Sequence, residues 1–336
     1  MWELLILLGG LGGTLVGGNL VVRRERLQAW KNLAATCGLE VVKASHSKLI
    51  YSQLEARDGP VTVRIESTSR TQGYSLRVLA TFPRPPGLFS SVKIRRKGSG
   101  LHDLEIGDEL FDRRFSVEGS TQMIAALLDE EARRLLLGVN FEAELEISGA
   151  ELRLVTSDRS LGNLLPLLLA LTRRFTEPVD IVQRLARNAR QDPAAGVRLH
   201  NLLALIRDFP GDPRTLETLR AACSDPSPGI RLRAARALGA ERRDVLFALA
   251  ESLEDDAASA EAVSILAGEL PFERLRAILD QASDKRFPQT VHACLEALGE
   301  KGAAPGQLSV ASPDAGQLSL APDAGQLSLP PGERQV

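Results

Sequence analysis

The first hydrophobic block of the chain runs from Leu4 to Val22 without a charged side chain. As a helix this block measures roughly 28 Å, close to the thickness of the hydrocarbon core of a bilayer. Positive charge follows the block at Arg23, Arg24 and Arg26. Because a secretory signal peptide carries its positive charge before the apolar run, the pattern favours a membrane anchor over residues 1–22 rather than a cleaved leader. The positive-inside rule then predicts a single-pass protein of the inner (plasma) membrane, with the bulk of the chain in the cytoplasm.

The glycines of this block recur at every fourth position, at Gly9, Gly13 and Gly17. Small residues at this spacing let two helix backbones approach closely in lipid, so the block can hold a homodimer together. Glycine is also common in membrane helices that do not associate, so both interpretations stay open.

After the anchor the pattern becomes that of a soluble protein. Residues 23–38 place apolar side chains on one face of a helix, which predicts a juxtamembrane helix. From 39 to 176 short alternating runs and helical runs are mixed, and we expect one α+β domain there. The predicted strands cover residues 49–54, 61–65, 74–82 and 88–95, with a second hairpin at 141–147 and 151–155. The predicted helices cover residues 121–137 and 160–175.

One stretch of this domain has a recognisable pattern, Gly107-Asp108-x-x-Phe111-Asp112-x-x-Phe115-x-Val117. We expect a turn at Gly107–Asp108 and a short strand beside the phenylalanines. The pattern resembles a small domain that is common in uncharacterised bacterial membrane-associated proteins, and this resemblance implies no known chemistry. Asp108 and Asp112 could act as acid–base or metal-binding carboxylates, but turn and strand-edge geometry is the favoured interpretation.

The segment 177–301 contains a repeated helical pattern. DPSPGIRLRAARALG at 225–239 closely resembles the second half of a bacterial HEAT-like (armadillo-type) repeat, and DPAAGVRLHNLLALI at 192–206 repeats it. Weaker copies lie at 255–268 and 284–299, each after another amphipathic run. The resemblance implies an all-α solenoid of about four helix pairs, in which no pair can bury its apolar face alone.

The last segment, 302–336, is rich in small residues and proline and is expected to be disordered. It repeats Gly-Gln-Leu-Ser-Val or Gly-Gln-Leu-Ser-Leu from Gly306, Gly316 and Gly325. Gln-Leu-Ser-Leu resembles the peptide that bacterial replication proteins use to bind the sliding clamp, but the aromatic residue that normally ends that motif is missing. Simple repeat expansion is therefore the favoured explanation.

Composition narrows the possible partners. The 336 residues are 44% hydrophobic and 25% charged, as in globular proteins, with a formal net charge of -2. Near-neutral charge and only 4% aromatic residues argue against nucleic-acid binding. Three scattered cysteines, Cys37, Cys223 and Cys294, fit a reducing compartment better than a disulfide framework.

Candidate chemistry is sparse. The four histidines (His46, His102, His200 and His292) have no metal-ligand spacing, so we expect no catalytic residue, cofactor or metal. The dense basic run comprises Lys93, Arg95, Arg96 and Lys97. It is either a solvated strand face or, together with Arg23, Arg24 and Arg26, a contact with anionic lipid headgroups.

Two functions remain. The first is a non-enzymatic, membrane-anchored scaffold that binds an unidentified protein through the solenoid, with Arg198, Arg231 and Arg233 as candidate contact residues. The second is a small-molecule sensor or enzyme built on the 39–176 domain, with the repeats as a regulatory arm. It would need a pocket that combines a basic partner with acids from the set Asp103, Glu105, Asp108 and Asp112.

Overall fold

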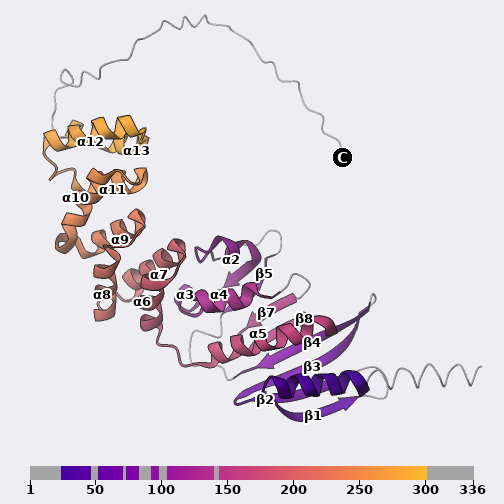
Figure 1. The fold of residues 1–336 in the computed structure, drawn as a ribbon. Coiled ribbons are helices and arrows are strands. Elements are labelled where there is room, and N and C mark those ends of the chain that lie inside the picture. Colours follow the sequence, from indigo (N-terminus) through magenta and orange to yellow (C-terminus); the bar gives the residue numbers. More distant parts are fainter. Residues whose placement is uncertain are drawn as a thin grey trace, which may run out of the picture.

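The computed structural model describes residues 24–46, 52–70, 73–82, 92–97, 104–139 and 144–300. They form an eight-stranded antiparallel sheet with helices against it, followed by a column of paired helices (Figure 1). The predicted anchor with Gly9, Gly13 and Gly17, as well as Arg23 and the tail 302–336, lies outside the described residues. Among those residues, no helix has both the length and the apolar character needed to cross a membrane.

The sheet has the strand order β1-β2-β3-β4-β8-β7-β5-β6, and every neighbouring pair is antiparallel. The strands are β1 (Glu40–His46), β2 (Ser52–Asp58), β3 (Val61–Arg70), β4 (Gly73–Thr81), β5 (Lys93–Arg96), β6 (Phe115–Glu118), β7 (Glu144–Ser148) and β8 (Glu151–Thr156). Both predicted hairpins are present. They turn at Gly59 and Gly149, which have φ of 55° and 58°, a conformation that glycine adopts without strain.

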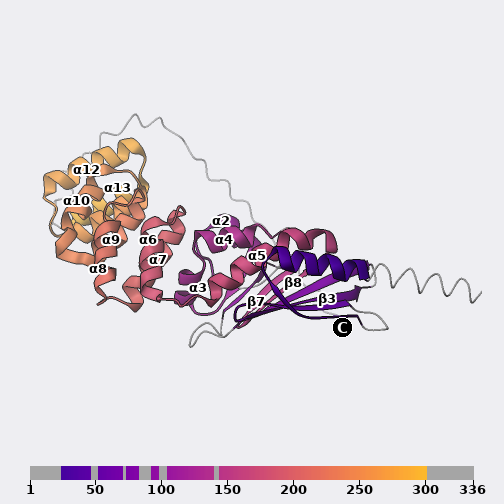
Figure 2. The same cartoon turned by 60° about the horizontal axis from the view of Figure 1, so that its bottom comes forward.

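One face of the sheet forms the core of the domain. The strands alternate buried apolar residues with exposed or half-buried ones, so each strand sends one side of its pleat inwards. The helix over residues 24–36 and α5 (Asp158–Thr176) lie along the same face (Figure 2). Leu27, Trp30 and Ala34 are buried there, and Trp30 Nε1 donates to Asp158 Oδ1 over 3.2 Å. The predicted juxtamembrane helix therefore packs against the domain through its apolar face.

Strand β1 was not predicted from the sequence, and two local predictions in this domain need correction. The stretch after Asp108 forms a short helix, α2 (Glu109–Arg114), before strand β6, because the Asp108 carboxylate accepts from Phe111 N and caps the helix. The helix predicted over 121–137 is two helices, α3 (Thr121–Leu127) and α4 (Glu130–Leu137). Asp129 caps the second of them by accepting from Ala132 N, so the chain turns between the two.

The column contains eight helices in four pairs. They are α6 (Ile181–Gln191), α7 (Ala195–Asp208), α8 (Pro213–Ala222), α9 (Pro228–Leu238), α10 (Arg243–Ser252), α11 (Asp256–Leu266), α12 (Phe272–Lys285) and α13 (Pro288–Glu300). Their buried side chains form one continuous cluster. Ala125 and Ala126 of α3 belong to the same cluster, so the helices of the first domain close the near end of the column.

Burial in this cluster predicts that the thiol of Cys294 reacts slowly with alkylating reagents. Cys294 of α13 is fully buried, which raises its pKa to about 11. At pH 8 roughly one such thiol in a thousand is ionised, and the thiolate is the reactive form. We expect iodoacetamide to alkylate the half-buried Cys37 before Cys294 in the native chain, and all three cysteines at similar rates in urea. Peptide mass spectrometry of timed samples measures this, and equal native rates at Cys37 and Cys294 would contradict the packing of α13.

Candidate functional site at the junction of the two domains

Arg133 of α4 is the centre of the junction between the sheet domain and the helical column. Its side chain is 3% exposed, and that of Asp192, before α7, is 1% exposed. Arg133 Nη1 and Nη2 each donate to one Asp192 oxygen over 2.9 Å, and Nε donates to Asp108 Oδ2 over 2.8 Å. Nη1 also donates to the Leu128 carbonyl. Burial opposes the charge of the guanidinium, but the bonds to Asp192 and Asp108 outweigh it and the pKa of Arg133 is raised.

The same arrangement recurs along the column. Arg198 of α7 donates to both oxygens of Asp225 over 2.8 and 2.9 Å, and to the carbonyls of Asp192 and Pro193. Arg231 of α9 donates to the carbonyls of Asp225 and Pro226 and to Glu254. We call Arg133, Arg198 and Arg231 the arginine series. Each member bonds to an acid in the loop that precedes the second helix of a pair: α7 for Arg133, α9 for Arg198 and α11 for Arg231. The first member belongs to the sheet domain.

Two glycines bring the backbones of the domains into direct contact. A Cβ added to Gly196 would lie 2.4 Å from the Gly107 carbonyl oxygen, and one added to Gly107 would lie 2.3 Å from the Gly196 carbonyl carbon. Gly107 also has φ of 88°, which L side chains rarely adopt. Beside this contact Asn188 Nδ2 donates to the Ala125 carbonyl over 3.0 Å. The junction therefore depends on glycine at both positions.

The two acids of the Gly107–Val117 pattern have defined roles. Asp108 caps α2 and accepts from Arg133, so it joins the turn to the junction. Asp112 accepts from Ile106 N over 3.1 Å and from Gly107 N over 3.0 Å, which fixes the turn. Burial raises the pKa of Asp112 although these two backbone bonds oppose the shift. Both carboxylates therefore stabilise the turn, as the sequence pattern suggested. The sequence pattern did not reveal that Asp108 also binds Arg133 at the junction.

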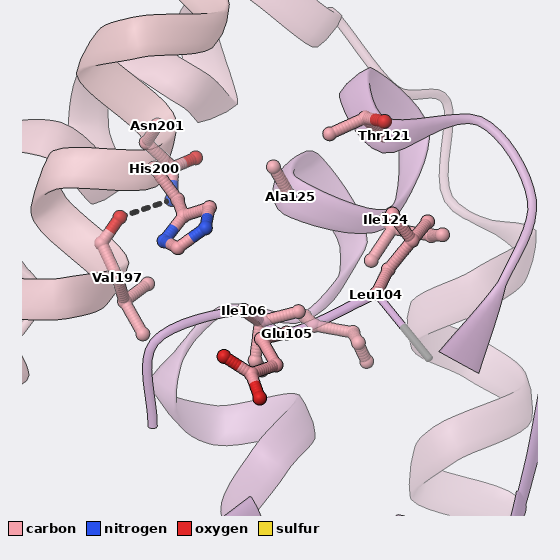
Figure 3. Close-up of a pocket in the computed structure, with 10 residues that line it drawn as sticks. Leu104, Glu105, Ile106, Thr121, Ile124, Ala125, Val197, His200 and Asn201 are labelled. Carbon is pink, nitrogen blue, oxygen red and sulfur yellow. Dashed lines mark hydrogen bonds between the residues drawn. The ribbon is translucent and has the colours of Figure 1, made fainter. Parts of the chain in front are cut away.

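A small cavity lies inside the junction (Figure 3). Its volume is about 20 Å³, and its walls come from both domains, with Leu104, Ile106 and Ile124 on one side and Val197 on the other. Asn201 Nδ2 donates to the Val197 carbonyl, whereas the buried Oδ1 has no partner. The space fits one water molecule, and a polar atom without a partner is where a buried water binds. The cavity is too small for a metabolite.

The predicted partner-binding arginines occupy two different environments. Arg198 and Arg231 belong to the arginine series, and their bonds are made within the chain. Arg233 lies on the accessible face of α9, where it and Arg236 donate to the same oxygen, Glu261 Oε1, over 2.6 and 2.8 Å. Sequence spacing could not separate these environments, because the partner carboxylates lie about one repeat further along the chain.

The predicted membrane-contact residues are mostly bonded within the domain. Lys93 and Arg95 pair with Glu118 on the neighbouring strand. Arg96 donates to the Val139 carbonyl and Lys97 to the Asp112 carbonyl. Arg26 pairs with Asp158 over 2.9 Å, whereas Arg24 is exposed. Contact with lipid headgroups stays a prediction for these residues.

The histidines give no metal site in the described part of the chain, where no group of acids, histidines and cysteines could hold an ion. His200 Nδ1 lies 3.0 Å from the Gly196 carbonyl oxygen, and His292 lies 3.7 Å from Glu296.

No protein-family model and no curated protein sequence matches the chain. Among solved structures, the crystal structure of the mycobacterial trehalose monomycolate transport factor A, TtfA, is distantly similar. The alignment covers 48% of this chain and 94% of that chain at 12% sequence identity, with a TM-score of 0.30. A similarity of this size carries no argument about function.

The buried pair predicts a large effect of Arg133→Met. The substitution leaves Asp192 and Asp108 without their counter-charge, which costs about 3–5 kcal/mol for a buried pair. Arg190→Met is the matched control, because Arg190 pairs with Glu217 at the surface and such pairs contribute about 0–1 kcal/mol. Urea unfolding followed by circular dichroism measures both. Equal midpoints for the two variants would show that the junction does not depend on Arg133.

The glycine contact predicts opposite effects for two equivalent glycines. Gly196→Ala forces a methyl group into the Gly107 backbone, and we expect a loss of about 1–3 kcal/mol, as for overpacking. Gly229 occupies the same position in α9, but a Cβ there meets nothing nearer than Ser227 Oγ at 3.9 Å. Gly229→Ala should therefore be neutral or stabilise by about 0.5–1 kcal/mol. Differential scanning calorimetry decides this, and a neutral Gly196→Ala would contradict the close approach.

Proposed function

We propose that the chain is a membrane-anchored interaction scaffold, in which the helical column binds a protein segment that carries acidic and apolar side chains. The proposed surface is the accessible side of α7 and α9, the second helices of the first two pairs. The charge on this side is the observation that carries the proposal.

Arg233 and Arg236 present more positive charge than the acids of the described residues neutralise. Both guanidinium groups share one oxygen of Glu261, so two cations face a single carboxylate. Their side chains are 39% and 61% exposed, and they remain accessible to a second anion. Arginine in such a position is a common anchor of protein interfaces, because its planar group binds a carboxylate through two hydrogen bonds.

An apolar side chain lies beside this charge. Leu203 of α7 is 40% exposed. The repeat offset that relates Asp192 to Asp225 also relates Leu203 to Arg236, and α7 packs against α9. The surface therefore offers an apolar contact next to a cationic one, which suits a segment with leucine-like and acidic residues.

The resemblance of this segment to HEAT-like repeats supports the proposal, since such solenoids use extended helical faces to hold protein segments. The predicted anchor supports the location: it would hold the column at the cytoplasmic side of the inner membrane. The alternative, a sensor or enzyme in the 39–176 domain, depends on acids of which Asp108 and Asp112 are bonded within the chain. An open pocket of about 560 Å³ does combine Asp108 with Arg133 and Arg134, but Asp108 and Arg133 are bonded to each other there.

The surface is tested by photo-crosslinking in the native host, with a benzoylphenylalanine in place of the exposed Ala237. We expect a partner protein whose crosslinked peptide contains Asp or Glu. Arg233→Gln combined with Arg236→Gln should lower the yield about tenfold, which corresponds to about 1.4 kcal/mol. Arg190→Gln, on the first helix of a pair, should leave the yield unchanged. A yield that ignores the double substitution, or a crosslinked peptide without acidic residues, would refute the proposal.

A further inference from the structure

The two ends of the helical column differ. At the near end, α3 of the sheet domain packs on α6 and α7 and buries Ala125 and Ala126 with them. At the far end, α12 and α13 form the last pair that the structure describes. A stack of helical pairs needs a cover at each end, because the outer pair otherwise exposes the surface that a neighbour would bury.

The last pair carries an open groove with a volume of about 470 Å³. Its floor is apolar, with Phe287 and Val291 half-buried and Leu295 41% exposed. Arg286 lines one side of the groove. It is the residue that ends α12, and its φ of 59° is in the left-handed region. Its side chain is exposed, and none of the acids in the described residues forms an ion pair with it. The groove therefore offers apolar contacts beside a cation.

We propose that this groove binds the chain's own C-terminal segment, residues 302–336, through its repeated Gly-Gln-Leu-Ser-Leu sequences. The segment starts at the end of α13, a helix that itself lines the groove. Val291 lies nine residues before Glu300, or roughly 14 Å along a helix. Residues 301–308 can span roughly 26 Å when extended, so even the first repeat reaches the groove with length to spare.

The repeats match the chemistry of the groove. Each has two apolar residues separated by one serine: Leu308 and Val310, Leu318 and Leu320, Leu327 and Leu329. In an extended segment, residues at i and i+2 point to the same side, so both would face the apolar floor. Asp314 and Asp323 lie between the repeats and bring a carboxylate close to Arg286.

Attachment explains why so short a sequence would suffice. Two leucine side chains bury little area, and a free peptide of this kind would bind weakly because ordering it costs entropy. A short flexible tether gives a local concentration in the millimolar range, and three copies compete for one groove. In this proposal the tether supplies the effective concentration that binding needs, and the repetition of the sequence raises the occupancy of the groove.

The test uses the full chain in detergent micelles, with the exposed His292 replaced by benzoylphenylalanine. After irradiation we expect crosslinks from position 292 to peptides within 306–329. Mixing isotopically heavy and light chains before irradiation identifies the source, and the crosslinks should join peptides of equal label. Heavy-to-light crosslinks would show a second copy in the groove, and crosslinks elsewhere or none to the tail would equally refute the proposal. The same probe at exposed Leu216, on α8, should give no crosslink to the tail.

Two variants make the test specific. Replacing the six apolar residues of the repeats by serine should lower the crosslink yield at least tenfold, whereas Gln307→Ala, Gln317→Ala and Gln326→Ala together should leave it unchanged. Leu295→Asp should lower it to the same extent from the other side. If Leu295→Asp disturbs the fold, the tail variants still decide, since their substitutions lie outside the helical column. An unchanged yield in the serine variant would overturn the proposal.

Discussion

The buried contact of Arg133 with Asp192 and Asp108 is the interaction on which the arrangement of the two domains depends. Two charged groups can leave water only when their hydrogen bonds are satisfied, and here the guanidinium meets two carboxylates and a carbonyl. No single domain supplies this set, since Asp192 comes from the column and the other groups from the sheet domain. Separating the domains would break the two bonds between Arg133 and Asp192, so this contact favours one arrangement of the two parts.

The Gly107–Val117 pattern gains a physical meaning from this contact. Gly107 allows the backbone to touch Gly196, Asp108 binds Arg133, and Asp112 holds the turn between them. Phe111 and Phe115 stack with ring centroids 4.9 Å apart and anchor the segment in the core of the sheet domain. Within this segment Asp108 joins the turn to the junction, whereas Glu109 and Arg113 pair with each other at the surface.

Periodicity was sufficient to place most elements. Alternation located both hairpins. The repeated Asp-Pro pattern located α7 and α9, and its weaker copies without the Asp-Pro pair located α11 and α13. The break between α3 and α4 was missed because the helical pattern of apolar residues continues across it. The one local signal is Asp129, which caps α4. The roles of Arg198 and Arg231 could not be predicted for another reason. Their positions on the helices look like surface positions, and the sequence does not show that an acid in the next loop accepts from each of them. Burial separates these arginines from Arg233: their side chains are 12% and 17% exposed, whereas that of Arg233 is 39% exposed.

The arginine series also determines which surfaces remain for other molecules. Its members are bonded to the loops before α7, α9 and α11 through Asp192, Asp225 and Glu254. Beyond it the packing of α11 on α13 relies on Asp256, which accepts from the amides of Gln289 and Thr290 instead of from an arginine. The cationic side of α9 and the apolar groove of the last pair both lie outside the series. A molecule bound at either surface would therefore leave the series intact, although a carboxylate on α9 would share Arg233 and Arg236 with Glu261.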